Sequence, residues 1–286
     1  MKNDIVTKMR LLMPTFSKSQ KKIANAILSD YNGTAYITAA KLASIVGVSE
    51  STVVRFATEL GFKGYPEFQK AIQQSITTKM TSNQRISAAE QHFAGGDILK
   101  SVMTSDIEKI KFTLENIDRG VFDSVVNTIL NAKRIFIMGT QSSASLAAFL
   151  NFNLSLFFSD VYLVQTASTN EAFEQMLDIN QDDVLFAITY PRYSMKIVNA
   201  CSYAQSEGAT VISLTDSLEA PVAPFSNHIL TAQSNMATFA DSLTAPISVL
   251  NAIVVALVVH GKRDELEARL NKLETLWEQY NVYAKQ

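Results

Sequence analysis

Residues 49–60 carry polar side chains whose spacing could bind DNA. Arg55 follows Thr52 by three residues and Ser51 by four, so in a helix it lies on the same face as both. Arginine can donate two hydrogen bonds to guanine O6 and N7, and serine or threonine can reach base edges or phosphates. The spacing also suits an ordinary helical hairpin with solvated polar residues, so the side chains alone leave both interpretations open.

Four further residues near this segment are candidate DNA contacts. Ser49 and Thr38 stand at positions expected to be helix N-caps, and we include both among the candidates. Lys63 and Tyr65 follow in a glycine-containing loop, where they could contact phosphates. The alternative is that Lys63 is a solvated loop charge and Tyr65 is a partly packed aromatic residue.

A second kind of chemistry is expected where apolar residues 134–138 lead into Gly139-Thr-Gln-Ser-Ser143. Backbone N–H groups and hydroxyls at the start of a helix could hold a phosphate, so Gly139, Gln141, Ser142 and Ser143 are candidate ligand residues. The dinucleotide pattern GxGxxG is not met, and there is no Walker pattern. The two serines could equally be a helix cap.

A similar loop follows the apolar residues 184–189. Thr189, Pro191, Arg192 and Ser194 are candidate ligand residues, with Ser194 the expected cap of the next helix. Arg192 would suit a phosphate or a carboxylate, because guanidinium forms paired hydrogen bonds with both. Alternatively, Arg192 is a solvent-facing loop residue.

The residues that would support other chemistry are few. The three histidines, His92, His228 and His260, do not have the spacing of a metal site. Cys201 is the only cysteine, so an internal disulfide is excluded and a buried apolar role is expected. We predict no catalytic residue, no metal and no cofactor.

The polar face of residues 49–60 needs a second helix to position it. Ser17 and Gln20 form a capping-box pattern that begins a helix, which Asn32-Gly33 should end. Next we expect a helix 39–45, capped by Thr38, and a turn 46–48 around Gly47. The helix Ser49–Leu60 follows, and its apolar face consists of Val53, Phe56, Ala57 and Leu60. A further helix, 66–77, begins with Pro66. Two short helices around a glycine turn are typical of a helix-turn-helix, whose second helix enters the major groove.

Composition and charge are consistent with two domains. The chain has 286 residues, of which 47% are hydrophobic and 18% charged, as in globular proteins. Residues 1–79 hold 11 Lys and Arg against 5 Asp and Glu, whereas the remainder has a net charge of −8. A basic N-terminal part suggests a polyanion partner, although chance surface charge is an alternative. The longest apolar stretch, 247–259, is too short to span a membrane and suits a buried helix. We expect a cytoplasmic protein.

The remaining chain predicts a parallel sheet. Residues 80–96 form a polar linker, and helical periodicity returns over 98–117. Five apolar runs, at 134–138, 161–164, 184–189, 210–215 and 228–231, alternate with helical segments at 143–157, 170–177 and 194–207. This alternation indicates βαβ units, in which ligands bind beyond the carboxyl ends of the strands. An amphipathic helix, 264–280, is expected to pack or to contact another subunit.

Both halves resemble one family of bacterial regulators. The stretch KLASIVGVSESTVVRFATELGFKGY, within residues 16–72, resembles the helix-turn-helix domain of RpiR-type transcription regulators. The stretch VISLTDSLEAPVAPFSNHIL, within 121–259, resembles the SIS (sugar isomerase) domain that follows in that family. The family loops usually read GxGxS and SxSGxT. Here Gln141 replaces the second glycine of GxGxS, and Arg192 replaces the glycine of SxSGxT. Both loops therefore depart from the family pattern.

The resemblance implies an all-helical DNA-binding domain at 1–79, a linker and connecting helix at 80–120, a parallel α/β SIS domain at 121–262 and a C-terminal helix at 263–286. It also implies a homodimer or homotetramer that binds an inverted-repeat operator and senses a small anionic metabolite, such as a phosphosugar. Two alternatives remain open: an SIS-type isomerase, for which Glu171 and Glu174 are candidates by position, and an interaction module with a vestigial sensor.

Overall fold

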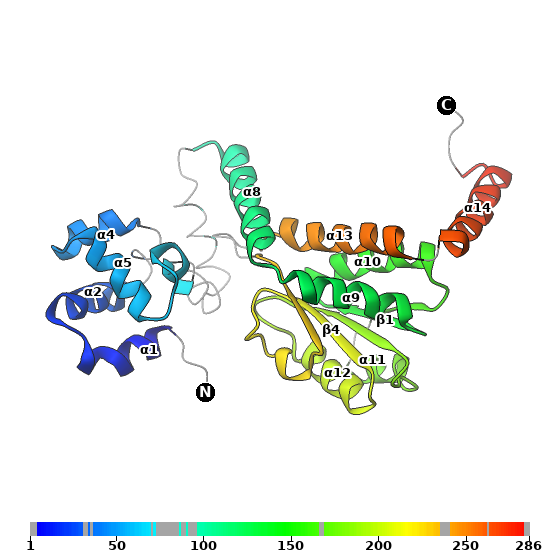
Figure 1. Ribbon diagram of the computed structural model, residues 1–286, viewed down its shortest axis with the longest axis horizontal. Helices are drawn as coiled ribbons and strands as arrows, with labels where there is room; N and C mark the ends of the chain where they lie inside the picture. Colours follow the sequence, from blue (N-terminus) through cyan, green and yellow to red (C-terminus); the bar gives the residue numbers. More distant parts are fainter. Residues whose placement is uncertain are drawn as a thin grey trace. The chain divides into compact units, whose positions relative to one another are not determined.

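The computed structural model describes residues 5–30, 34, 37–69, 71–72, 86, 90, 96–165, 169–234, 241–261 and 263–282. The chain forms two compact units (Figure 1), Met1–Gly95 with Asn235–Asp241, and Gly96–Ser234 with Ser242–Gln286. Most of the expected linker 80–96 lies outside the described residues, as do Asn32, Gly33 and His92.

The described part of the N-terminal unit is helical. Its elements are α1 (Ile5–Leu12), η1 (Met13–Thr15), α2 (Lys18–Ser29), α4 (Ala39–Val46) and α5 (Glu50–Glu59), and residues 65–69 are also helical. One apolar cluster joins these helices, with Ile23, Leu42 and Phe56 fully buried. Helix α1 was not predicted, although Ile5 and Met9 lie one turn apart and are buried in the same cluster.

Local capping explains where α2 and α4 begin. The predicted capping box at Ser17 is confirmed, because Ser17 Oγ accepts from Gln20 N and the Gln20 side chain accepts from Ser17 N. Thr38 caps α4 by accepting from Lys41 N. Helix α2 ends at Ser29, three residues earlier than the Asn32-Gly33 pair suggested.

The second unit contains the predicted parallel sheet. The strands are β1 (Ile135–Gly139), β2 (Val161–Val164), β3 (Val184–Ile188), β4 (Thr210–Thr215) and β5 (His228–Thr231). All pairings are parallel in the order β2-β1-β3-β4-β5. Strand β2 lies on one side of β1, and β3 and the later strands lie on the other side. The strand order therefore reverses between β1 and β3, and ligands bind at such a switch point in open α/β sheets.

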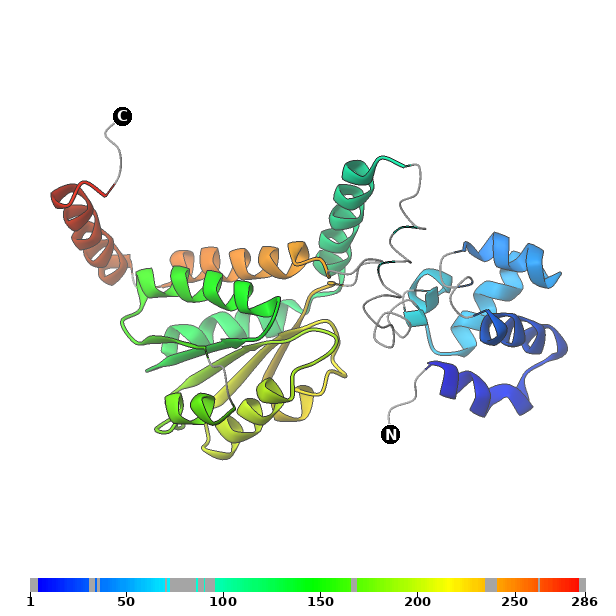
Figure 2. The same cartoon turned by 180° about the vertical axis from the view of Figure 1, so that it is seen from behind.

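Helices cover both faces of this sheet (Figures 1 and 2). One face packs against α9 (Arg119–Asn131), α10 (Ser143–Phe157) and α13 (Thr244–His260). The other packs against α11 (Thr169–Gln175) and α12 (Met195–Ser206). Every residue of β3 is buried, as expected for the centre of a sheet covered on both sides. Helix α8 (Ile98–Asn116) contacts α13, η2 (Ala223–Phe225) precedes β5, and α14 (Arg263–Gln279) follows α13.

One prediction about this unit was wrong in part. The apolar stretch 247–259 lies in α13, but that helix is buried on one side only: Val255 is 60% exposed and Val259 is 69% exposed. Among the described residues, no helix combines the length and the hydrophobicity needed to cross a membrane.

Candidate functional site

The turn between α4 and α5 has the geometry of a helix-turn-helix. Gly47 adopts a left-handed conformation, with φ of 70°, and its N–H and that of Val48 donate to the carbonyl of Ala43. An L side chain at this φ would be strained, so glycine allows the chain to leave α4 and enter α5 within three residues. Ala43 is buried where the two helices pack.

Helix α5 has the two faces that its sequence indicates. Val53, Phe56, Ala57 and Leu60 are completely buried in the apolar cluster of the N-terminal unit. Ser51 and Arg55 are exposed on the other side, and Thr52 is partly exposed. The residues that could reach a DNA groove are therefore held on a helix whose opposite face is fixed by packing.

Three hydroxyl groups gather at the start of α5. Ser49 Oγ accepts from Thr52 N at 3.3 Å and lies 2.9 Å from Ser51 Oγ and 2.7 Å from Thr52 Oγ1. The cluster orients hydroxyls at the helix N-terminus, where N–H groups favour a negative partner such as a phosphate. Thr38 is exposed at the start of α4.

The structure gives Tyr65 a different role from the predicted DNA contact. Its side chain is only 4% exposed, and its hydroxyl donates to the carbonyl of Ile37 at 2.9 Å. Gln69 Nε2 donates to the same carbonyl at 2.8 Å. Burial raises the pKa of Tyr65 to about 12. We correct the assignment: Tyr65 positions the residue before Thr38, and its side chain is too buried to bind DNA directly.

Lys63 remains a candidate phosphate contact. Its side chain is exposed, and its backbone N–H donates to the Glu67 carboxylate, which fixes the loop.

Replacing Lys63 with alanine should weaken binding to all DNA sequences by a similar factor, because phosphate contacts carry no sequence information. The slope of log affinity against log salt should fall by about 1. Fluorescence anisotropy with operator and random duplexes across a salt series measures both quantities. A selective loss on the operator alone would assign Lys63 to a base instead.

The first predicted ligand loop joins β1 to α10, and its backbone passes very close to the first turn of α10. A Cβ on Gly139 would lie 2.4 Å from the carbonyl oxygen of Ser143, so only glycine fits there. Gln141 has a φ of 54°, in the left-handed region that favours glycine. Ser142 stands at the N-cap of α10 but accepts no capping hydrogen bond, and Ser143 is buried.

The second predicted loop has the same backbone feature. Arg192 has a φ of 68° and is exposed. Thr189 is buried beside β4 and donates its N–H to Leu214 O. Pro191 is partly exposed, and Ser194 stands at the N-cap of α12 without a side-chain capping bond. Gln141 and Arg192, which replace the glycines of the family patterns, thus keep a glycine-like backbone.

A cavity of about 350 Å³ opens between the two loops. Gly139, Gln141 and Ser194 line it, together with Thr140, Gln165 and Lys196 and some apolar side chains. The structure therefore brings together three of the predicted residues, whereas Ser142, Ser143, Thr189, Pro191 and Arg192 are not among its lining.

Lys196 is the charged side chain of this cavity, and it was not identified from the sequence. It lies in the first turn of α12, where the positive end of the helix dipole disfavours a cation. A lysine there, directly after a strand-end loop, is the signal that could have identified it. An anion in the cavity would offset this repulsion and pair with the ammonium.

Two buried hydroxyls near the carboxyl edge of the sheet have no hydrogen-bond partner among the described residues. Tyr190, two residues after β3, is 6% exposed, and Ser234, three residues after β5, is fully buried. Burial raises the pKa of Tyr190 well above its usual value. Buried hydroxyls without a hydrogen bond cost free energy. The edge of the sheet that carries both loops therefore contains polar groups whose hydrogen bonds are not all formed.

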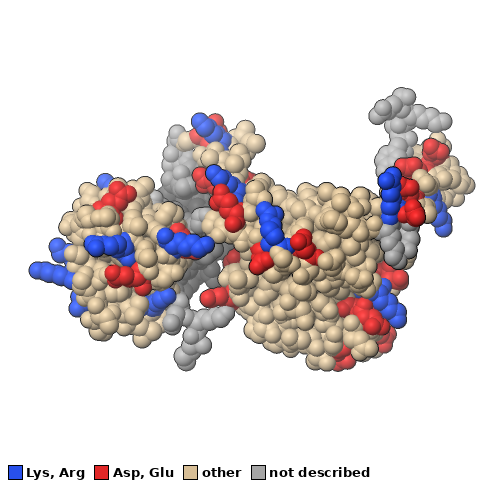
Figure 3. Space-filling model, viewed as in Figure 1, with Lys and Arg blue, Asp and Glu red and all other residues tan. Residues whose placement is uncertain are grey.

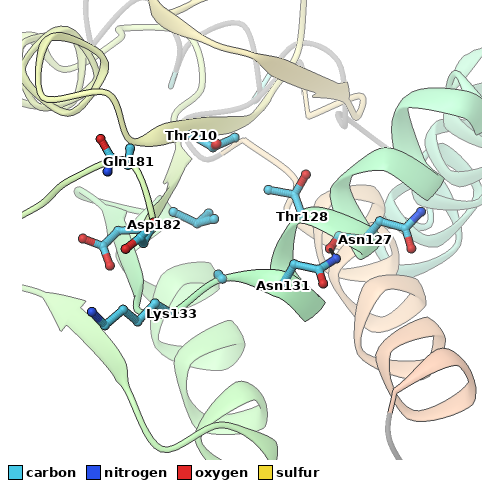
Figure 4. A pocket seen from close by; sticks show the side chains of 10 residues that line it. Asn127, Thr128, Asn131, Lys133, Gln181, Asp182 and Thr210 are labelled. Atoms are coloured by element: carbon cyan, nitrogen blue, oxygen red, sulfur yellow. Dashed lines mark hydrogen bonds between the residues drawn. The ribbon is translucent and has the colours of Figure 1, made fainter.

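A second polar cavity, of about 550 Å³, lies at the amino edge of the sheet (Figure 4). Thr128 and Asn131 of α9 face Gln181 and Asp182 across the opening, and Lys133 lies beside it. The sequence did not indicate this cavity. Because open parallel sheets bind ligands at the carboxyl edge, the smaller cavity is the better candidate.

Other chemistry finds little support in the part of the chain that the structure describes. No group of three or more His, Cys, Asp or Glu side chains there could hold a metal. Glu171 and Glu174, the isomerase candidates, are exposed on α11. Cys201 is buried, and burial raises the pKa of its thiol to about 12, which disfavours a reactive thiolate.

The two units define a class of protein: a helical region with helix-turn-helix geometry and a five-stranded parallel α/β domain. Residues 4–79 match the family described as helix-turn-helix domain, rpiR family, and residues 128–256 match the SIS domain. The chain belongs to the rpiR family of helix-turn-helix transcriptional regulators that carry a SIS domain.

Individual relatives agree with this assignment. A helix-turn-helix regulator from Haemophilus influenzae is 28% identical over 270 residues, covering 91% of this chain and 92% of its own. HexR of Escherichia coli is 26% identical over 220 residues, covering 74% and 72%. Vibrio vulnificus NanR, solved with ManNAc-6P, has a TM-score of 0.60 at 21% identity, covering 98% of this chain and all of its own. At that identity the likeness to NanR shows the fold.

Proposed function

We propose that this transcriptional regulator binds operator DNA as a dimer or higher oligomer and changes its operator affinity when a small anionic metabolite occupies the SIS domain. The observation that carries the ligand part is the cavity between the β1 and β3 loops, with Lys196 and two uncapped helix N-termini around it. We propose a phosphosugar-like ligand, and a cytoplasmic location follows from the role.

The DNA part of the proposal rests on α5. Ser51, Thr52 and Arg55 form its exposed face, with Ser49, Thr38 and Lys63 close to it in the sequence. We propose that Arg55 binds a base and that the others bind phosphates or base edges. Helix-turn-helix proteins read two-fold half-sites roughly 34 Å apart or at multiples of that spacing, so the operator should be an inverted repeat.

The ligand part rests on charge and backbone geometry. The phosphate would lie near the first turns of α10 and α12, at the positive end of each helix dipole, and would pair with Lys196. Arg192 lies in the loop before α12 and could add a second cation. NanR, which shares the fold, was solved with a sugar phosphate, and this supports the same class of ligand here.

Regulation requires the ligand to bind one arrangement of the oligomer better than another. Only that difference in affinity can shift the equilibrium between arrangements, and with it the spacing of the two DNA-binding units. Helix α8 provides a connection, because Thr113 Oγ1 accepts from the N–H of Gln233, which follows β5 at the carboxyl edge.

Lys196→Ala should weaken the binding of an anionic ligand by about tenfold, the loss of ~1.4 kcal/mol of charge-assisted hydrogen bonding. A thermal-shift screen of phosphosugars and small carboxylic acids, ManNAc-6P included, would first identify the ligand. Titration of the variant with that compound, in the presence of operator, gives the affinity and the DNA response.

Lys133→Ala is the matched control, because Lys133 lies at the polar cavity on the opposite edge. If Lys133→Ala abolished the response and Lys196→Ala did not, the ligand site would lie at the amino edge. If no anion raised the melting temperature, the sensor would be vestigial. Turnover of a sugar phosphate that Glu171→Gln abolishes would establish the isomerase alternative.

A further inference from the structure

An apolar groove runs along α13, on the side that α8 and α9 flank. It has a volume of about 540 Å³, and its apolar lining includes Ile110 and Leu114 of α8, Phe122 of α9, and Val249, Val255 and Val259 of α13. Leu114, Val255 and Val259 are each more than half exposed. Figure 3 shows a broad uncharged area over α13.

This groove is unusual for the surface of a single chain. Helix α13 has no Asp, Glu, Lys or Arg in its 17 residues. A helix that is apolar on every side is normally buried on every side, and exposed apolar patches mark sites of interaction. The α8–α13 groove is therefore expected to be covered.

Helix α14 has the shape and the side chains to cover it. Leu266, Leu270 and Leu273 recur at helical spacing and are only partly buried, and Leu276 is 40% exposed. None of these leucines belongs to the apolar clusters of the second unit. A ridge of leucines on a helix can fill a concave apolar groove, whereas two concave grooves cannot fill each other.

The helix cannot occupy the groove of its own chain in this arrangement. Arg269 ties α14 to the end of α10, donating to Ser159 Oγ and to Ser155 O, each at 3.0 Å. Helices α8 and α14 lie at opposite ends of α13, and the distal half of α14 points away from the rest of the unit (Figures 1 and 2). Among the residues that the structure describes, several side chains of the groove and Leu276 of the ridge therefore stay exposed.

Charge also favours the pairing. Arg119 and His260 line the groove among its apolar side chains. The distal half of α14 carries Glu274 and Glu278, one turn apart and next to Leu273 and Trp277 in the sequence. A carboxylate on the docked helix would face a cation at the groove, as complementary interfaces do.

We propose that the distal half of α14 from a second copy of this chain docks in the groove between α8, α9 and α13. Under a two-fold axis each chain offers one groove and one helix, so the contact is made twice and closes a dimer. Two such contacts raise the buried area towards the roughly 800 Å² per partner that stable dimers bury. The inference deepens the self-association proposed above and does not depend on the identity of the ligand.

Cysteine pairing in the full-length protein tests this contact. An affinity-tagged Val255→Cys chain is mixed with an untagged Leu276→Cys chain and mildly oxidised. We expect a disulfide-linked heterodimer in the mixture and much less of any product from either variant alone. Wild type is the first control, because its only cysteine is buried. Leu218→Cys with Leu276→Cys is the second, because Leu218 is 67% exposed but lies outside the groove.

Light scattering completes the test. Leu276→Asp should raise the dimer dissociation constant by about tenfold to a hundredfold, because it places a charge in an apolar contact. Dimers that form without the Val255–Leu276 link, or that link Val255 to Val255, would overturn the docking and leave the proposed regulator intact. A wild-type chain that stays monomeric at all concentrations would contradict both.

Discussion

Phe56→Ala should destabilise the N-terminal unit by about 3–5 kcal/mol and abolish operator binding at physiological temperature. Phe56 is completely buried, and its ring packs edge-on against Phe16 at 5.3 Å and Phe68 at 5.8 Å. Removing the ring leaves a cavity between α5, the segment before α2 and the helix at 65–69. Because a small helical unit has few kcal/mol in reserve, the loss would leave α5 without its support.

The unfolding can be assigned to one unit because Trp277, the only tryptophan, lies in α14 of the other unit. Far-UV circular dichroism should show an early loss of helix on heating, while Trp277 fluorescence keeps its wild-type transition. Val54→Ala is the control on the same helix, because Val54 is 38% exposed, and its melting curve should change little. A normal CD melt for Phe56→Ala would contradict the described packing.

Arg55→Ala should lower operator affinity by about 1–3 kcal/mol, roughly fivefold to 150-fold, if Arg55 donates to a guanine. Arg55 is exposed on the side of α5 opposite the buried Val53 and Ala57, so the substitution should leave the melting temperature unchanged. The affinity for random DNA should fall much less, so the variant loses specificity. Arg55→Lys should restore charge but not the paired hydrogen bonds, and should remain less specific than wild type.

An operator selected from random duplexes by the wild-type protein supplies the substrate for this measurement. Anisotropy titrations on that duplex and on single-base variants locate the base that Arg55 contacts, since the variant protein should ignore changes at that position. An equal loss on every duplex would instead assign Arg55 to a phosphate. Unchanged affinity would remove Arg55 from the DNA-binding surface.

Local rules explain why so much of both units could be predicted. The capping box at Ser17, the cap at Thr38 and the turn at Gly47 depend on residues within four positions of each other, and all are present. The bounds of β2, β4 and β5 agree with the apolar runs in the sequence, and β1 and β3 differ by one residue at their ends. Alternation of strand and helix was enough to predict a parallel sheet.

What could not be predicted depends on long-range packing. Tyr65 follows a glycine loop and has the composition of a surface contact, but its hydroxyl reaches Ile37, 28 residues earlier. Lys196 lines the candidate site only because the loops after β1 and β3 border one cavity. The partial exposure of α13 is not visible in an apolar stretch, because the sequence shows hydrophobicity and not which neighbour covers it.

Gln141 and Arg192 give the two candidate ligand loops a backbone conformation typical of glycine, together with side chains that glycine lacks. A side chain at such a position costs about 1–2 kcal/mol relative to the right-handed conformation, and glycine avoids that cost. Both loops accept it and thereby present an amide and a guanidinium where glycine would present only backbone. Gln141 lines the cavity of the proposed ligand site. We therefore predict that exchanging its side chain would change ligand selectivity, so a biosensor built on this chain could be retuned at that position without redesigning the fold.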